Sequence, residues 1–170
     1  ILNRKVLKNK ELLNEDEIML GKLSDNVRTM FTSGTSGPSK GVMMPNAHCV
    51  LFAIGTIENY NLKDYHIFYI SLPLFHANGL FMQLLACIMT GAKAVIRTRF
   101  SASNWLNDIR NYNITHTNML GAIAAFIVAQ PPTKYDKDHN LELIGSAPLP
   151  SEPEKIFRNR FGVKLSLIHI

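Results

Sequence analysis

The sequence predicts an α/β protein with a mostly parallel sheet flanked by helices. Short apolar segments alternate with longer segments of helical pattern through most of the 170 residues. Glycine or proline stands at several of the boundaries between them. This alternation is typical of parallel sheets, because a parallel connection needs a crossover long enough to hold a helix.

The predicted elements begin with two short strands, residues 27–31 and 41–44, on either side of a polar loop. A helix then begins near Asn46 and runs to about Glu58. Five more strands, at 66–74, 92–97, 115–119, 141–147 and 163–168, are separated by helices at 79–91, 101–113, 121–130 and 151–162. Gly91 and the prolines at 131 and 132 end two of these helices.

Composition excludes several classes of protein. The net charge of +5 comes from 18 basic and 13 acidic residues, and the basic residues are scattered, whereas a nucleic-acid surface needs them clustered. No apolar run reaches the roughly 18 residues that span a bilayer. Cys49 and Cys87 lie in apolar helical segments, which predicts buried thiols in a reducing, cytoplasmic environment.

Residues 1–26 read as a polar lead-in segment without the apolar core of a signal peptide. The chain does not begin with methionine, so we expect it to be part of a longer protein. In a parallel sheet, ligands bind where the carboxyl ends of strands meet. Three loops follow predicted strands in this way, at residues 32–41, 73–79 and 145–150.

The loop from Thr32 to Gly41, TSGTSGPSKG, holds three glycines, five hydroxyl side chains and one lysine. Glycine lets backbone N–H groups converge, hydroxyls add donors and Lys40 adds a cation, which together suit a phosphate group. The loop is not a Walker A sequence, because Lys40 is followed by glycine and the second required glycine is missing. A surface turn rich in small residues, with Lys40 as a plain surface charge, is the alternative.

The order of residues in this loop resembles the phosphate-binding signature of the adenylate-forming (AMP-binding) superfamily, which includes the acyl-CoA synthetases. The matching residues are Thr32, Ser33, Gly34, Thr35, Ser36, Gly37, Lys40 and Gly41. Ser39 stands where proline is usual. Two later segments resemble further family motifs in the same order: LPLFHANGL, which contains His76, and GSAPLP, residues 145–150.

The resemblance implies activation of a small-molecule carboxylic acid with ATP and Mg²⁺ to an acyl-adenylate, followed by transfer to coenzyme A. The eight matching loop residues would bind the ATP phosphates, and Lys40 would stabilise the charge that develops on pyrophosphate. The residues of the acyl and adenine pocket would be His76, Gly145, Ser146, Ala147 and Pro148. His76 is expected to shape the pocket during catalysis and not to act as a general base, because an ionised carboxylate needs none.

Residues 27–170 would then form a partial AMP-binding domain. The family continues after a segment like FGVKL into Y-G-x-T-E, whose glutamate holds Mg²⁺, whereas this chain ends in SLIHI. We therefore expect the 170 residues alone to be inactive as a ligase and to self-associate through a truncated sheet edge. From Phe31 onward, the sequence most resembles crotonobetaine/carnitine-CoA ligases. The alternative function is a non-catalytic regulatory module that binds a nucleotide or phosphate.

The remaining histidines lack a surrounding motif. They are His48, His66, His116, His139 and His169. Their spacing to one another and to the cysteines matches no metal-binding pattern, so the sequence predicts no metal site made by protein side chains.

Overall fold

The computed structural model describes residues 22–32, 38–146 and 151–167. It divides into two compact units, residues 1–49 and 50–170, which are described separately. The first contains a β-hairpin of β1 (Asn26–Thr32) and β2 (Lys40–Pro45). The second contains the sheet, and helix α2 (Asn46–Tyr60) continues into it.

The hairpin corrects one part of the sequence interpretation. Both predicted strands are present, but they pair antiparallel with each other in a separate two-stranded sheet, from Asn26–Pro45 to Thr32–Lys40. Phe31 and Met43 are 75% and 70% exposed, so these are not core strands. The connection between Thr32 and Lys40 is too short for a parallel crossover, which explains the antiparallel pairing.

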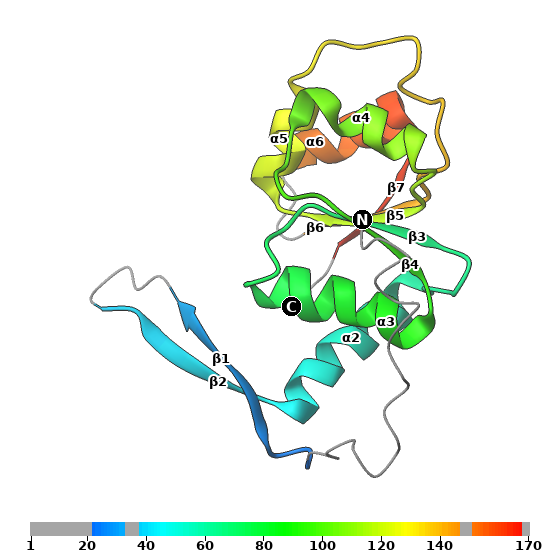
Figure 1. The fold of residues 1–170 in the computed structure, drawn as a ribbon. Helices are drawn as coiled ribbons and strands as arrows, with labels where there is room; N and C mark the ends of the chain where they lie inside the picture. Colours follow the sequence, from blue (N-terminus) through cyan, green and yellow to red (C-terminus); the bar gives the residue numbers. More distant parts are fainter. Residues whose placement is uncertain (1–21, 33–37, 147–150, 168–170) are drawn as a thin grey trace. The chain divides into compact units, whose positions relative to one another are not determined.

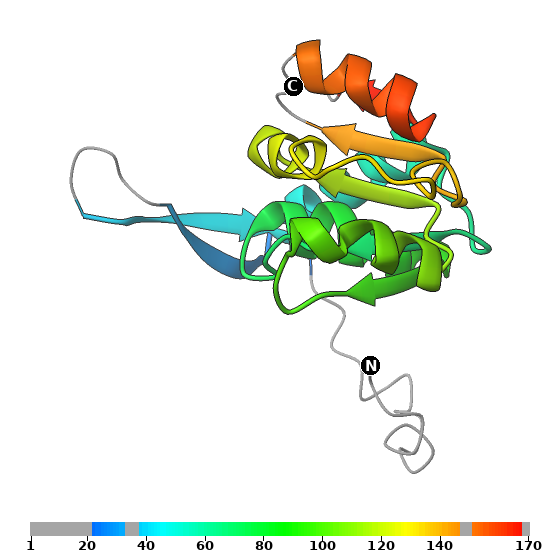
Figure 2. The same ribbon diagram turned by 90° about the horizontal axis from the view of Figure 1, so that it is seen from above.

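The second unit confirms the predicted parallel α/β class. Its five strands lie in the order β4 (Lys93–Ile96), β3 (Ile67–Ile70), β5 (His116–Met119), β6 (Leu143–Ser146) and β7 (Lys164–Leu167). Every neighbouring pair is parallel, and Figure 2 shows the arrowheads of β4, β5 and β6 pointing the same way. All five predicted strands are therefore present, each somewhat shorter than predicted.

Helices cover both faces of this sheet (Figure 1). One face carries α4 (Ala102–Asn111), α5 (Gly121–Val128), α6 (Ser151–Ile156) and the π-helical η3 (Phe157–Phe161). The other carries α2, the π-helical η2 (Asn78–Leu85) and α3 (Ala86–Thr90). The predicted helix at 79–91 thus has two parts, and it ends as predicted at Gly91, which has a left-handed φ of 77°.

Alternation along β3 builds the two halves of the core. Tyr69 points toward the cluster that contains Trp105 of α4, whereas Phe68 and Ile70 join Ala53 of α2. All of these side chains are at most 1% exposed. Because successive residues of a strand face opposite sides, the continuous apolar run of β3 matches a strand buried on both faces.

Both cysteine thiols lie inside the protein. Cys49 and Cys87 are both free and buried, as predicted. Burial raises the pKa of the Cys87 thiol to about 12, which makes it a packing residue and not a nucleophile. Among the described residues, no helix is both long and apolar enough to cross a membrane.

Gly145 of β6 is fixed by packing against the end of α2. A side chain at this position would overlap the hydroxyl and ring of Tyr60, which is 4% exposed and stacks on Phe68 at 6.1 Å between ring centroids. The missing side chain of Gly145 therefore makes the space that Tyr60 occupies.

We predict that Gly145→Ala destabilises the 170-residue chain by about 1–3 kcal/mol, because the added methyl group forces Tyr60 out of its position. Urea denaturation measures this loss. Tyr60→Leu in the same chain should recover part of it, so that the two substitutions are non-additive. Strictly additive losses would show that the two residues do not compete for the same space.

Candidate functional site

The topology of the sheet selects one edge as the candidate site. From β3 the chain crosses to β4 over one face, and from β4 it returns past β3 to β5 over the opposite face, through α4. The direction of winding thus reverses between β3 and β5. In open α/β sheets, ligands bind beside the carboxyl ends of strands at such a reversal.

The segment that follows β3 is held tightly against this edge. A side chain on Gly79 would lie 2.5 Å from the carbonyl oxygen of Pro73 and 2.7 Å from that of Leu72. Only glycine therefore lets the start of η2 approach the backbone that leaves β3. The backbone N–H of His76 donates to Pro73 O at 3.1 Å, which closes a turn immediately before the helix.

His76 lies exposed on this turn. Its Nδ1 accepts a hydrogen bond from the backbone N–H of Asn78 at 3.3 Å. A neutral ring in this arrangement carries its proton on Nε2. In this orientation the hydrogen bond fixes the tautomer of a neutral ring.

Three carboxamide side chains link this turn to the neighbouring strand. The Oδ1 of Asn78 accepts hydrogen bonds from Nε2 of Gln83, at 2.8 Å, and from Nδ2 of Asn118, at 3.1 Å. Gln83 is fully buried and Asn118 is 1% exposed. Asn118 belongs to β5, so the network joins the carboxyl ends of β3 and β5.

The edge also holds buried polar atoms that make no hydrogen bond among the described residues. They are Oε1 of Gln83 and Oγ of Ser146, the last residue of β6. Ser146 is 1% exposed and pairs in register with Met119 at the end of β5. Such atoms cost free energy unless water or a ligand satisfies them.

A charged group near the same edge has a structural role. Arg97, which follows β4, donates from Nε to Oδ2 of Asp108 at 3.1 Å. The same carboxylate oxygen accepts a hydrogen bond from the Tyr69 hydroxyl at 3.0 Å. Burial is the main cause that raises the pKa of Tyr69, and the neighbouring Asp108 is the second. The three groups join β3, β4 and α4, so the Arg97 charge is already compensated.

The predicted site residues divide among three places. His76 and Ser146 lie on the carboxyl edge of the sheet, whereas Gly145 faces Tyr60 and acts in packing. Ala147 and Pro148 lie outside the described residues. Of the phosphate loop, the structure describes the paired ends, Thr32–Lys40 and Phe31–Gly41, with Lys40 exposed; Ser33, Gly34, Thr35, Ser36 and Gly37 lie outside the described residues.

The carboxamide network was missed by sequence reasoning, although two of its members carried a signal. Asn118 lies inside a predicted strand, where asparagine is depleted. Gln83 is the single strongly polar side chain in the apolar run GLFMQLLACIM. A polar side chain at a position that must be buried needs a hydrogen-bond partner. Asn118 and Gln83 therefore each indicate a hydrogen bond, although the sequence does not identify the partner.

Comparison with known proteins shows the family to which this chain belongs. A profile of the AMP-binding enzyme family matches residues 3–169. The chain belongs to this family, which confirms the resemblance carried by the loop motifs.

This chain covers only part of the length of each relative that it matches. The chain is 32% identical over 133 residues to long-chain fatty acid transport protein 6 of Mus musculus, covering 78% of this chain and 21% of the relative. It is 29% identical over 140 residues to the medium/long-chain-fatty-acid–CoA ligase FadD17 of Mycobacterium marinum, covering 82% and 28%. The chain thus spans less than a third of either protein.

A solved structure supports the fold. The O-succinylbenzoate coenzyme A synthetase (MenE) of Bacillus subtilis, in complex with ATP and magnesium ion, superimposes with a TM-score of 0.72. The match covers 89% of this chain and 32% of that protein, at 24% identity. The 170 residues therefore have the fold of one part of an adenylate-forming enzyme.

We predict that Asn78→Ala destabilises the chain more than Asn118→Ala. Loss of the Asn78 oxygen leaves two buried donors unpaired, at about 1–3 kcal/mol each, whereas loss of Asn118 leaves that oxygen with its Gln83 partner. Urea denaturation of both variants gives the order. Asn107→Ala, at an exposed position on α4, is the matched control and should cause no loss; equal effects of all three substitutions would contradict the network.

Proposed function

We propose that the whole protein is an acyl-CoA synthetase that activates a carboxylic acid with ATP. The carboxylate oxygen attacks the α-phosphorus of ATP, and the bond from that phosphorus to the leaving pyrophosphate breaks. The thiol of coenzyme A then attacks the acyl carbon and releases AMP. Membership of the AMP-binding enzyme family carries this proposal, and the ligase name of FadD17 supports the transfer to coenzyme A.

The phosphate-binding part of the reaction is assigned to the segment from Thr32 to Gly41. The antiparallel pairing of Thr32 with Lys40 brings the two ends of this segment to adjacent strands of a hairpin. Glycine N–H groups, hydroxyls and the Lys40 ammonium are donors that stabilise charge on pyrophosphate without changing their own protonation. Magnesium, when bound, would neutralise phosphate charge, and the Y-G-x-T-E pattern whose glutamate would hold it does not occur in these 170 residues.

The acid-binding part is assigned to the carboxyl edge of the sheet, with His76 and Ser146 as residues that contact the substrate. The carboxamide network positions the His76 turn against β5. The names of the relatives favour an aliphatic acid of medium or long chain, and a carnitine-type acid is kept as a second candidate. A cytoplasmic location, suggested by the buried free thiols, is part of the same proposal.

The test of the activity is acid-dependent exchange of pyrophosphate into ATP by the whole protein with Mg²⁺. We expect exchange with at least one member of a panel that includes short, medium and long fatty acids and carnitine. Lys40→Ala should raise the KM for ATP roughly fivefold, because a screened, exposed charge contributes on the order of 1 kcal/mol.

Lys137→Ala, at an exposed lysine in the loop before β6, is the matched control and should leave the KM unchanged. Nucleotide binding without exchange for any acid would favour the alternative of a regulatory phosphate-binding module. A loss of thermal stability in Lys40→Ala with normal kinetics would favour a structural role for the loop.

The role of His76 is tested by acid preference. We predict that His76→Ala changes the ratio of kcat/KM between medium- and long-chain acids by about tenfold, as expected for a pocket of altered shape, with little change in the KM for ATP. His76→Asn, which keeps a polar acceptor near the Asn78 N–H, should lie closer to the parent. An unchanged preference in both variants would place the acyl pocket elsewhere.

A further inference from the structure

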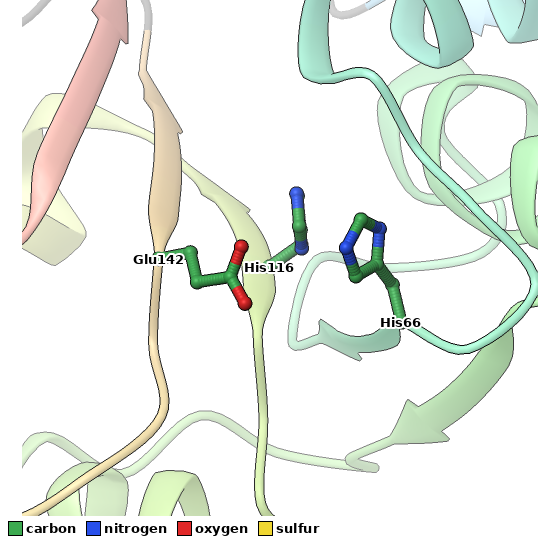
Figure 3. Close-up of side chains that lie close together, drawn as sticks. All are labelled: His66, His116 and Glu142. Carbon is green, nitrogen blue, oxygen red and sulfur yellow. The ribbon is translucent and has the colours of Figure 1, made fainter.

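Two buried histidines meet at the opposite edge of the sheet, where the strands begin. His66 immediately precedes β3, and His116 is the first residue of β5, the neighbouring strand. Their rings lie 4.2 Å apart between centroids, with planes inclined at 37°. Figure 3 shows the two rings side by side, with the Glu142 carboxylate on the other side of His116. A positive charge on one ring therefore acts directly on the other.

Burial makes a charge on this histidine pair costly. His66 and His116 are 5% and 2% exposed, and a charged group taken out of water costs free energy unless a partner compensates it. The carboxylate beside the pair belongs to Glu142, which immediately precedes β6 and is exposed. Its attraction for a protonated ring is screened by water and salt. The surroundings of the pair therefore favour neutral rings.

The hydrogen bonds of His66 fit only the neutral ring. Its Nδ1 accepts the backbone N–H of Lys63 at 3.0 Å. The neutral ring therefore carries its proton on Nε2, the nitrogen on the side of His116 (Figure 3). An added proton would have to sit on Nδ1, where it would face the Lys63 N–H and break that hydrogen bond.

The hydrogen bonds of His116, in contrast, allow it to take up a proton. Its Nε2 lies 3.3 Å from the carbonyl oxygen of Tyr60, which can only accept, so the neutral ring carries its proton there. Its Nδ1 lies 2.9 Å from Oγ1 of Thr115. That hydroxyl lies 3.2 Å from the carbonyl oxygen of Ile67, to which it can donate while it accepts from a protonated Nδ1. His116 is therefore the member of the pair that can become charged without losing a hydrogen bond.

Solvent has a route to His116. A surface cavity of about 380 Å³ is lined by His116 and Glu142, together with Tyr60, Leu141, Leu143 and Gly162. The cavity lets a proton reach the buried ring without unfolding of the sheet.

The other elements around the pair offer no buried compensating charge among the described residues. From α2 comes Tyr60, and burial raises the pKa of its phenol, so that group is neutral. The exposed ring of Tyr65 meets His66 edge-on at 4.4 Å between centroids. On the β4 side, the backbone N–H of Lys93 donates to the carbonyl oxygen of His66 at 3.0 Å. The charged side chains of these neighbouring segments are of both signs and all are exposed: Lys63, Asp64, Lys93 and Glu142.

The direction of the pH dependence follows from the pKa of His116. Burial is the main cause that lowers this pKa from its ordinary value of 6.5, and the neighbouring His66 is the second; the Tyr60 carbonyl and Glu142 act in the opposite direction. At a pH between the lowered value and 6.5, the unfolded chain holds a proton on this histidine that the folded chain lacks. Stability is therefore fully present above about pH 6.5 and falls as the pH decreases toward the lowered pKa.

We propose that the His66–His116 pair is a pH-sensitive switch at the amino edge of the sheet. The neutral rings hold the starts of β3 and β5 and the end of α2 together, and a proton taken up by His116 on acidification loosens these contacts. The switch lies on the edge opposite to the proposed acid site, and it does not depend on the proposed function.

The first test is urea denaturation of the 170-residue chain at several pH values between about 5 and 8. We expect the equilibrium constant for unfolding of the parent to increase as the pH falls below about 6.5. His116→Gln keeps a polar side chain that does not titrate, so it should remove up to about tenfold of this increase per pH unit, the effect of one proton. His48→Gln, at an exposed histidine outside the pair, is the matched control and should keep the pH dependence of the parent.

The second test uses NMR on the parent chain, and it decides the matter if His116→Gln does not fold. The ring resonances of His116 should titrate with a midpoint below 6.5. Amide exchange, corrected for its intrinsic pH dependence, should accelerate on acidification more at Lys93 and Thr115, whose N–H groups bond to His66 and Ile67, than at Ile109 in α4. A midpoint at or above 6.5, uniform acceleration, or an unchanged pH dependence in folded His116→Gln would overturn the proposal.

Discussion

Parallel pairing of the five strands is the constraint on which the rest of the second unit depends. Because all strands run the same way, each crossover must return the chain over one or the other face of the sheet. The carboxyl ends of all the strands therefore lie on the same edge. The polar turn after β3 and the ends of β5 and β6 therefore meet, although they lie far apart in sequence. The same constraint gathers the residues that precede these strands on the opposite edge, where His66, His116 and Glu142 lie together.

Close contacts at two glycines shape the carboxyl edge of the sheet. Gly79 lets η2 start directly against the turn that leaves β3, and Gly145 makes room for Tyr60 against β6. Neither position is a turn that needs a left-handed backbone; both are places where a methyl group would collide with a buried neighbour. The tight fit at Gly145 shows that a glycine in a segment resembling a family motif serves packing.

The two edges satisfy their buried polar groups differently. At the carboxyl edge, Asn78 accepts from two other carboxamides, and atoms of Gln83 and Ser146 have no partner among the described residues. At the amino edge, Nδ1 of His66 accepts the backbone N–H of Lys63, and Nε2 of His116 lies beside the carbonyl oxygen of Tyr60. The carboxyl edge is therefore joined by side-chain amides, whereas the hydrogen bonds of the two histidines at the amino edge go to backbone groups and to a neighbouring hydroxyl.

The sequence by itself determined the α/β class, the succession of strands and helices along the chain and the helix end at Gly91. It also determined the burial of Cys49 and Cys87 and the family. All of these follow from local periodicity, turn residues and motifs. Only the tertiary structure decided that β1 and β2 form a separate hairpin, that Asn78, Gln83 and Asn118 share hydrogen bonds, and that His66, His116 and Glu142 meet. Those contacts join residues of different elements, and which elements become neighbours depends on strand order. Strand order is set by the packing of the whole sheet and its helices, and so no local pattern around Asn118 or His116 could name the partner of either residue.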